Sequence, residues 1–235
     1  MFAAVFTDIH GNYQALDAIL NEIKKYNVTD IICLGDVIGL GPDSDKCLKR
    51  IKEENIRFIV GNHELNYTKH IDKYTDYSEG EKLHNEWIHD NMTETIENNV
   101  LSYEANVRGK KVLFVHYFLS NKLYPYESSS IFESDKYKYV MDRLNYDYVF
   151  YGHLHQERKD VINNKTFYCL DSSGCTKDDN TFFYLVSIRN EVSVEKVNVK
   201  YDRESFIESL LSRDYPQRKE IALKFFGINI KDTNL

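Results

Sequence analysis

The sequence has little proline and no long apolar run. Three prolines in 235 residues, with no low-complexity tract, argue against a flexible linker, so we expect one domain over residues 1–235. No apolar stretch approaches the length that a membrane span requires, which predicts a protein without a membrane segment. Residues 1–6 lack the basic lead of a signal peptide and run directly into a polar motif. We therefore expect a cytoplasmic protein.

Cysteine is also scarce, and its spacing is not that of a zinc or redox motif. The four cysteines form no C-x-x-C pair: Cys33, Cys47, Cys169 and Cys175. Two of them, Cys33 and Cys169, lie in apolar runs that are typical of strands. We interpret all four as reduced cysteines that fill the interior of a cytoplasmic protein.

Clusters of basic residues are absent as well. The chain has 30 Lys and Arg residues against 37 Asp and Glu residues, which gives a formal net charge of -7. Proteins bind a nucleic-acid duplex mainly through Lys and Arg contacts to its phosphates. The sequence therefore argues against a nucleic-acid duplex as the main partner.

Five short apolar runs are each followed by polar side chains that can bind metal ions. In chain order, the polar residues are Asp8 and His10 after the run at 3–7, Asp36 after 31–34, Asn62 and His63 after 58–60, His116 after 112–115, and His153 and His155 after 148–151. Short apolar runs bounded by glycine are typical of buried strands. We expect these strands to deliver their polar ends to one edge of a sheet, where open α/β sheets bind ligands. Oxygen and imidazole donors without a thiolate suit a pair of hard or borderline divalent metal ions.

The remaining pattern predicts helices and hairpins around these strands. The first half alternates strand and helix, which favours parallel neighbours, and Asn12 is placed to cap the first helix. The other predicted elements are helices at 43–52, 131–144, 203–211 and 217–226, and hairpins that pair 101–107 with 111–116, 158–162 with 166–170, and 182–189 with 192–199. With Gly227 as the last helix C-cap, this order predicts a sheet-on-sheet core flanked by helices.

The segment at about 64–99 interrupts the alternation of strand and helix. Ser78 and Glu81 match a capping box, and the helix that they begin would align Leu83 and Trp87 on one face. The segment is either a helical lid whose aromatic side chains stack a nucleoside base, or a set of helices that pack with polar outer faces. The histidines without motif spacing are assigned to the surface: His70, His84 and His89.

The polar ends of the strands form five ordered motifs: Asp8-x-His10, Gly35-Asp36, Gly61-Asn62-His63, His116 and Gly152-His153-x-His155. Together they resemble the motifs of the calcineurin-like metallophosphoesterase superfamily over residues 8–155. The loop at 35–42 is similar to one in small bacterial phosphoesterases, including diadenosine-tetraphosphatase-like members. The resemblance implies an α+β fold, a four-layer α/β/β/α sandwich of two mixed β-sheets flanked by helices. It also implies a dinuclear metal site at the C-terminal ends of the strands.

The resemblance further implies roles for these side chains. Seven of them would hold two metal ions: Asp8, His10 and His155 at the first, Asn62, His116 and His153 at the second, and Asp36 as the bridge between them. His63 would face the substrate as general acid for the leaving oxygen, and the neighbouring Glu64 is a candidate to orient it. Manganese and iron are the family's expected ions, and the same nitrogen and oxygen ligands accommodate Zn, Co or Ni.

The implied activity is hydrolysis of phosphoester bonds by a hydroxide that two metal ions activate. The loop similarity favours a phosphodiesterase or dinucleoside polyphosphate hydrolase that acts on a small phosphoester or a nucleotide. The alternative is a phosphomonoesterase for small molecules or phosphoproteins, although Val60 stands where protein serine/threonine phosphatases have an arginine. A non-catalytic binding module of the same fold is a less favoured hypothesis. The oligomeric state stays open.

Overall fold

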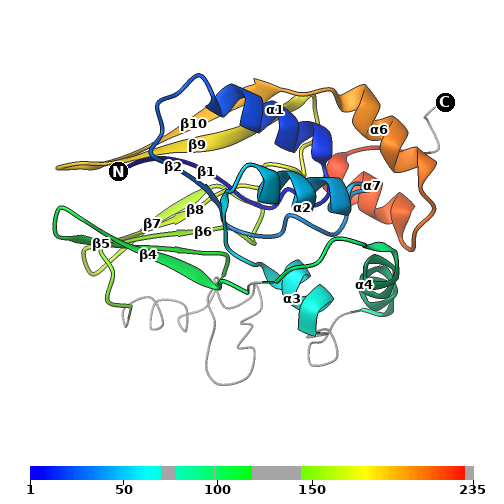
Figure 1. Ribbon diagram of the computed structural model, residues 1–235, viewed down its shortest axis with the longest axis horizontal. Helices are drawn as coiled ribbons and strands as arrows, with labels where there is room; N and C mark the ends of the chain where they lie inside the picture. The colour runs from blue at the N-terminus through cyan, green and yellow to red at the C-terminus, as the bar shows by residue number, and fades with distance from the viewer. Residues whose placement is uncertain (70–77, 98, 118–143, 231–235) are drawn as a thin grey trace.

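Two β-sheets lie face to face, and helices cover one of them and gather at one end of the molecule (Figure 1). The structure is a computed structural model that describes residues 1–69, 78–97, 99–117 and 144–230. Each sheet has five strands in mixed orientation. This arrangement confirms the predicted class of two mixed sheets flanked by helices.

Sheet 1 contains the first three strands of the chain. Its order is β10-β9-β1-β2-β3. The strands are β1 (Phe2–Phe6), β2 (Asp30–Cys33), β3 (Arg57–Phe58), β9 (Asn180–Ile188) and β10 (Val192–Lys200). As predicted, β1, β2 and β3 run parallel, whereas β9 and β10 form an antiparallel hairpin that adds to the other side of β1.

Two helices connect the parallel strands and cover the outer face of sheet 1 (Figure 1): α1 (Tyr13–Ile23) and α2 (Ser44–Glu53). The side chain of Asn12 accepts a hydrogen bond from the backbone N–H of Ala15 at 3.0 Å, which caps α1 as predicted. Leu16 and Ile19 of α1 are buried in one cluster with Phe6 of β1. Helical spacing of apolar residues therefore fixes α1 against the sheet.

Sheet 2 is built from the second half of the chain, in the order β4-β5-β6-β8-β7. The strands are β4 (Ser102–Val107), β5 (Lys110–Val115), β6 (Tyr148–Tyr151), β7 (Arg158–Ile162) and β8 (Lys165–Cys169). The rings of Phe114 and Phe150 stack at 5.1 Å, and those of Phe150 and Tyr168 at 5.0 Å. This aromatic row shares one buried cluster with Val5 and Ile32 of sheet 1, so it joins the two sheets.

Four further helices of the described part of the chain gather at the end of the molecule where the strand motifs emerge (Figure 1): α3 (Asn62–Lys69), α4 (Glu79–Asn91), α6 (Arg203–Ser212) and α7 (Arg218–Phe226). The capping box of Ser78 and Glu81 is present, and Gly227 ends α7 with a left-handed φ of 65°. Helix α4 forms as predicted, so Leu83 and Trp87, four residues apart, share a face; the residues that α4 buries are His84 and Ile88, whereas Leu83 is 44% exposed.

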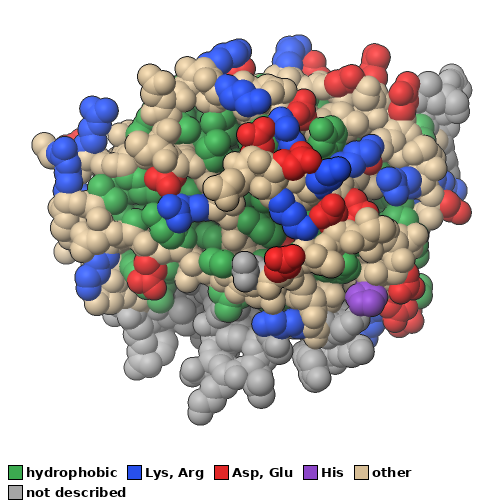
Figure 2. Space-filling model, in the orientation of Figure 1, with side chains coloured by type: hydrophobic (Ala, Val, Ile, Leu, Met, Phe, Trp, Pro, Cys, Tyr) green, Lys and Arg blue, Asp and Glu red, His purple; other side chains and the backbone are tan. Residues whose placement is uncertain are grey.

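The remaining expectations concern one helix, membrane segments and surface charge. Residues 131–143 of the helix predicted at 131–144 lie outside the described residues. None of the described helices is long and apolar enough to cross a membrane. On the face that Figure 2 shows, acidic and basic side chains are interspersed over α1 and α2, where Arg50 pairs with Asp17 and Glu54.

Candidate metal centre

The five motifs meet where the two sheets come together, so the prediction of a single sheet edge is wrong. β1, β2 and β3 end in sheet 1, whereas β5 and β6 end in sheet 2. The open end between the sheets collects all the predicted site residues: Asp8, His10, Asp36, Asn62, His63, His116, His153 and His155. The predicted site residues therefore meet because two sheets pack face to face, and not because their strands end at one edge of a single sheet.

The backbone turns sharply at most of the predicted ligands. Five of them have left-handed φ angles between 50° and 72°: Asp8, His10, Asp36, His153 and His155. This conformation is uncommon for residues other than glycine and costs on the order of 1 kcal/mol each. Glycines make room beside them, since a Cβ at Gly61 would collide with Asp36 and one at Gly152 with Asp8. The structure thus maintains local strain where these side chains converge.

The first predicted set of ligands, Asp8, His10 and His155, is brought together. Nε2 of His10 lies 2.9 Å from Nε2 of His155. Oδ1 of Asp8 lies 3.2 Å from Nε2 of His155 and 3.7 Å from Nε2 of His10. The other carboxylate oxygen, Oδ2, accepts hydrogen bonds from the Thr7 hydroxyl at 2.6 Å and the His153 backbone N–H at 3.1 Å. These bonds hold Oδ1 toward the two imidazoles.

The second set, Asn62, His116 and His153, also converges. Oδ1 of Asn62 lies 3.1 Å from Nε2 of His116 and 3.0 Å from Nδ1 of His153. Asp36 lies between the two sets, since its Oδ2 is 3.1 Å from Nε2 of His116 and 3.8 Å from Nε2 of His10. Its Oδ1 accepts a hydrogen bond from the His63 backbone N–H at 3.0 Å. This is the position that a bridging carboxylate requires.

The donor set fits divalent metal ions. Nδ1–H of His116 donates to the carbonyl of Leu34 at 3.0 Å, and Nδ1–H of His10 donates to that of Ile38 at 3.3 Å. When these two rings are neutral, each Nε2 atom carries a lone pair and faces a carboxylate oxygen, which also carries lone pairs. Two hydrogen-bond acceptors therefore face each other with no donor between them. Oδ1 of Asp8 is buried and makes no hydrogen bond within the described residues. Two cations, one at each set of ligands, would satisfy all of these atoms.

The electrostatics of the buried carboxylates also favour a cation at this centre. Burial lowers the pKa of His116, but the Asp36 and Asp8 carboxylates outweigh burial and raise that pKa to about 9. Burial would raise the pKa of the Asp8 and Asp36 carboxyls, yet His116 and other histidines hold both pKa values well below the ordinary range. The carboxylates therefore require nearby positive charge, which a proton on His116 or a divalent cation can supply.

Glu64 has a different role from the predicted orientation of His63. Its buried carboxylate accepts backbone hydrogen bonds from Asp36 at 2.9 Å, Val37 at 2.8 Å, Ile38 at 3.1 Å and Gly61 at 2.6 Å. Burial and the Asp36 carboxylate raise the pKa of Glu64 to about 7, against the opposing effect of these donors. Glu64 thus ties the loop that carries Asp36 to the start of α3.

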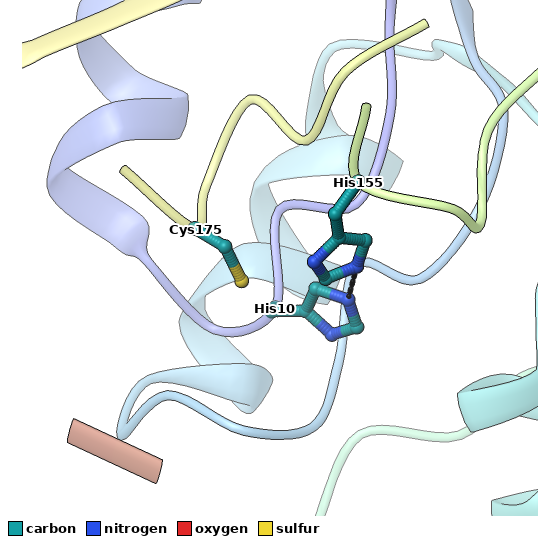
Figure 3. A group of neighbouring side chains, drawn as sticks. All are labelled: His10, His155 and Cys175. Carbon is teal, nitrogen blue, oxygen red and sulfur yellow. Dashed lines mark hydrogen bonds between the residues drawn. The ribbon is translucent and has the colours of Figure 1, made fainter. Parts of the chain in front are cut away.

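One residue near the centre, His84, was assigned wrongly from the sequence, and a second, Cys175, has neighbours that the sequence did not reveal. His84 is 3% exposed, not on the surface, and its Nε2 accepts a hydrogen bond from the Leu40 backbone N–H at 3.1 Å. His89 is exposed as predicted, and His70 lies outside the described residues. Cys175 lies among the predicted ligands, since its Sγ and one ring nitrogen each of His10 and His155 are within 4.8 Å of one another (Figure 3). Neither residue has a motif spacing that could reveal this.

A cavity of about 740 Å³ opens beside the converging side chains. His63 and three of the histidine ligands, His10, His153 and His155, line one side. The start of α4, with Glu81 and His84, and one face of α7, with Lys224 and Phe225, line the other. Trp87 is partly buried and packs against Tyr215, with ring centroids 5.2 Å apart, and it is not among the residues that line the cavity.

The comparisons with known proteins agree with this geometry. The model of the calcineurin-like phosphoesterase family matches residues 3–157, so the chain belongs to this family. The uncharacterized protein MJ0912 of Methanocaldococcus jannaschii is 29% identical over 234 residues, covering 91% of this chain and 93% of its own length. The metallophosphoesterase structure from Sphaerobacter thermophilus, 16% identical, superposes with a TM-score of 0.67 over 94% of this chain and 99% of that one.

A higher sequence identity is found over a shorter segment of the chain. The symmetrical bis(5'-nucleosyl)-tetraphosphatase of Wigglesworthia glossinidia brevipalpis is 40% identical over 79 residues, which are 32% of this chain and 29% of that enzyme. Family membership and this similarity identify the chain as a metal-dependent phosphoester hydrolase.

Proposed function

We propose that the protein is a dinuclear-metal phosphodiesterase or dinucleoside polyphosphate hydrolase. The observation that carries the proposal is the convergence of the seven predicted ligands, in two sets joined by Asp36, beside a cavity of about 740 Å³. When bound, two divalent ions would supply a nucleophile from water at neutral pH and would offset the charge of the phosphoryl group. Manganese and iron are the proposed ions, and the ligand set also admits zinc, cobalt or nickel.

In this proposal His63 donates a proton to the leaving oxygen. Its ring lines the cavity and lies edge-on to that of His10, with centroids 4.8 Å apart. Burial lowers the pKa of His63 to about 3, so the ring is neutral in the free protein at neutral pH. A bound phosphoryl anion favours the protonated ring, because an opposite charge nearby raises the pKa of a histidine. Substrate binding would therefore favour uptake of a solvent proton by the His63 ring, and this proton can then pass to the leaving oxygen.

The part of the substrate beyond the reacting phosphate would lie between α4 and α7. Lys224 and Phe225 offer a positive charge and an aromatic face on the α7 side of the cavity. Phe225 reaches the reacting end, because its ring lies 5.9 Å from that of His155. The volume suits a ligand larger than inorganic phosphate, which favours a diester or a dinucleotide over a small monoester. In this proposal α4 forms one wall of the substrate site.

The test measures hydrolysis of a phosphodiester, a phosphomonoester and a dinucleoside tetraphosphate by protein loaded with Mn²⁺. We expect the diester or the dinucleotide to be hydrolysed faster than the monoester. Faster turnover of the monoester would make the protein a phosphomonoesterase. Background rates for all three substrates with several metal ions would overturn the proposed function, provided that the far-ultraviolet circular dichroism shows an intact fold.

The role of His63 has its own prediction. We expect His63→Ala to lower kcat by roughly 10²–10⁴-fold, the range that one general acid contributes, without changing the bound metal content. The matched control is His89→Ala, which removes an exposed histidine of α4. A leaving group that needs no protonation should rescue the His63 variant. Equal kcat values for the two variants would remove His63 as the proton donor and leave the metal assignment intact.

A further inference from the structure

A thiol lies beside a set of nitrogen and oxygen ligands, which the sequence did not predict. Cys175 is in the loop that follows β8, and Figure 3 shows its sulfur pointing toward the rings of His10 and His155. The sulfur and one nitrogen of each ring lie within 4.8 Å of one another. This separation allows one metal ion to contact all three after small side-chain movements, because Zn–S and Zn–N bonds are about 2.3 and 2.0 Å long.

Hydrogen bonds fix the loop of Cys175 against the loop of Asp8. The Ser172 hydroxyl donates to the Asp8 carbonyl at 2.7 Å, and the Gly174 backbone N–H donates to the same carbonyl at 3.1 Å. The Cys175 backbone N–H donates to the Ser172 hydroxyl at 2.9 Å, and the Asn12 side chain donates to the Gly174 carbonyl at 2.9 Å. A Cβ at position 174 would collide with the Ile9 backbone. Cys175 is therefore held in place by its backbone.

A second observation points to a ligand beside the same two histidines. Asp8 is fully buried, and its Oδ1 makes no hydrogen bond within the described residues although it lies 3.2 Å from Nε2 of His155. Nε2 of His155 in turn lies 2.9 Å from Nε2 of His10. With the bridging Asp36 carboxylate, one Asp8 oxygen, two imidazole nitrogens and one sulfur would give the first ion five donors, a number that zinc sites can reach.

The other three cysteines lack this surrounding. Cys33 and Cys47 are buried in the cluster between sheet 1 and its helices. Cys169 is buried in sheet 2, and its Sγ lies 3.7 Å from the Gly152 carbonyl. Cys175 is the one that is partly exposed, and therefore the one that solvent and ions can reach.

We propose that the Cys175 thiolate is an additional ligand of the ion held by Asp8, His10 and His155. The inference rests on the proposed metal centre and extends it. On binding, a metal–sulfur bond forms and the thiol proton passes to solvent. The sulfur makes this position soft and selective for thiophilic ions such as Zn²⁺ or Co²⁺, whereas the position of Asn62, His116 and His153 has only nitrogen and oxygen donors and suits harder ions. The two positions would therefore prefer different metals.

Cobalt spectroscopy tests the proposal without measuring activity. Cobalt(II) bound to a thiolate gives a near-ultraviolet charge-transfer band, in addition to the visible d–d bands that any bound cobalt shows. We expect both in the wild-type protein and loss of the charge-transfer band alone in Cys175→Ser. The matched control, Cys47→Ser, should keep both. We also expect the Zn²⁺-over-Mn²⁺ preference of Cys175→Ser to fall at least about tenfold, since even loss of an outer-sphere partner costs that much.

A second experiment uses only the wild-type chain, so its result does not depend on whether the Cys175→Ser variant folds. Iodoacetamide should alkylate Cys175 in the metal-free protein, and Zn²⁺ should protect it, with the modified peptide identified by mass spectrometry. Visible cobalt bands without a charge-transfer band, or equal alkylation with and without Zn²⁺ in a protein that binds Zn²⁺, would overturn the thiolate ligand and leave the proposed metal centre standing. Absence of bound cobalt in the wild-type protein would overturn both.

Discussion

At the scale of single residues, the centre depends on groups that would never touch a metal ion. Glu64 is the main example, because its two carboxylate oxygens accept four backbone N–H groups, three from Asp36 to Ile38 and one from Gly61, the residue before Asn62. Removing a buried acceptor leaves its donors unsatisfied, which costs more than the net value of the hydrogen bond itself. The geometry of the ligands therefore depends on a residue that follows the motif.

We predict that Glu64→Gln destabilises the protein by about 2 kcal/mol or more and weakens metal binding. One side of the amide would place an N–H against backbone N–H groups, and each unsatisfied buried donor costs about 1–3 kcal/mol. Urea unfolding and metal titration check the two effects. The control is Glu97→Gln on the exposed surface. Equal unfolding free energies for the two variants would contradict the role assigned to Glu64.

At the scale of elements, α4 is attached to the body of the protein at several points. His84 accepts the Leu40 backbone N–H, and Trp87 packs against Tyr215. Just beyond the end of the helix, the backbone N–H groups of Thr93 and Glu94 donate to the Asp45 carboxylate at 3.0 and 2.9 Å. These contacts position the wall of the cavity that α4 provides.

We predict that His84 makes stability fall with pH in the acidic range. Burial lowers its pKa to about 4 from the ordinary value of 6.5. Between these values the unfolded chain takes up a proton that the folded chain does not, so stability declines as pH falls through 6.5 and the loss is complete near pH 4. Its size is about 3 kcal/mol at most, from 1.36 kcal/mol per pKa unit.

Urea unfolding between pH 7.5 and pH 4 tests this contribution. The variant His84→Gln keeps an acceptor for the Leu40 N–H but does not titrate, so its stability should depend less on pH than that of the wild-type protein. His89→Gln, at an exposed site, should follow the wild-type profile. Parallel profiles for the wild-type protein and the His84 variant would contradict the prediction.

At the scale of the whole molecule, the centre joins two sheets. Asp8, Asp36 and Asn62 follow strands of sheet 1, whereas His116 and His153 follow strands of sheet 2. Ions held by both groups would bind the folded state far better than the unfolded chain. Binding to the native state alone stabilises it by RT ln(1 + [L]/Kd), which is about 2.7 kcal/mol at an ion concentration of 100 Kd.

We therefore predict that Mn²⁺ raises the Tm of the protein and that a chelator reverses the increase. Differential scanning calorimetry measures the shift directly. Asp36→Asn should lose most of it, because the variant keeps the acceptor for the His63 N–H but lacks the bridging charge. Asp90→Asn, at a site that is 79% exposed, should keep the full shift. An unchanged Tm in the wild-type protein at saturating Mn²⁺ would contradict the coupling between the sheets.

Much of the architecture could be predicted from local patterns. Apolar runs predicted the strands, Asn12 and Ser78 predicted helix starts, and turn residues predicted the hairpins. The strand, cap and turn predictions succeed because their signals lie within a few residues of the feature that they determine. The division of the ligands into two sets came from the resemblance to the family and stays a prediction, although the distances bring the members of each set together.

The sequence by itself determined which side chains emerge at the ends of the strands, because that depends only on a strand and the residue after it. Only the tertiary structure decided that two sheets share the centre, that Glu64 binds the Asp36 loop, and that His84 and Cys175 lie beside the ligands. The physical reason is that these contacts join segments from 20 to more than 160 residues apart. Spacing along the chain carries no signal for hydrogen bonds or side-chain contacts that form only when distant segments pack together.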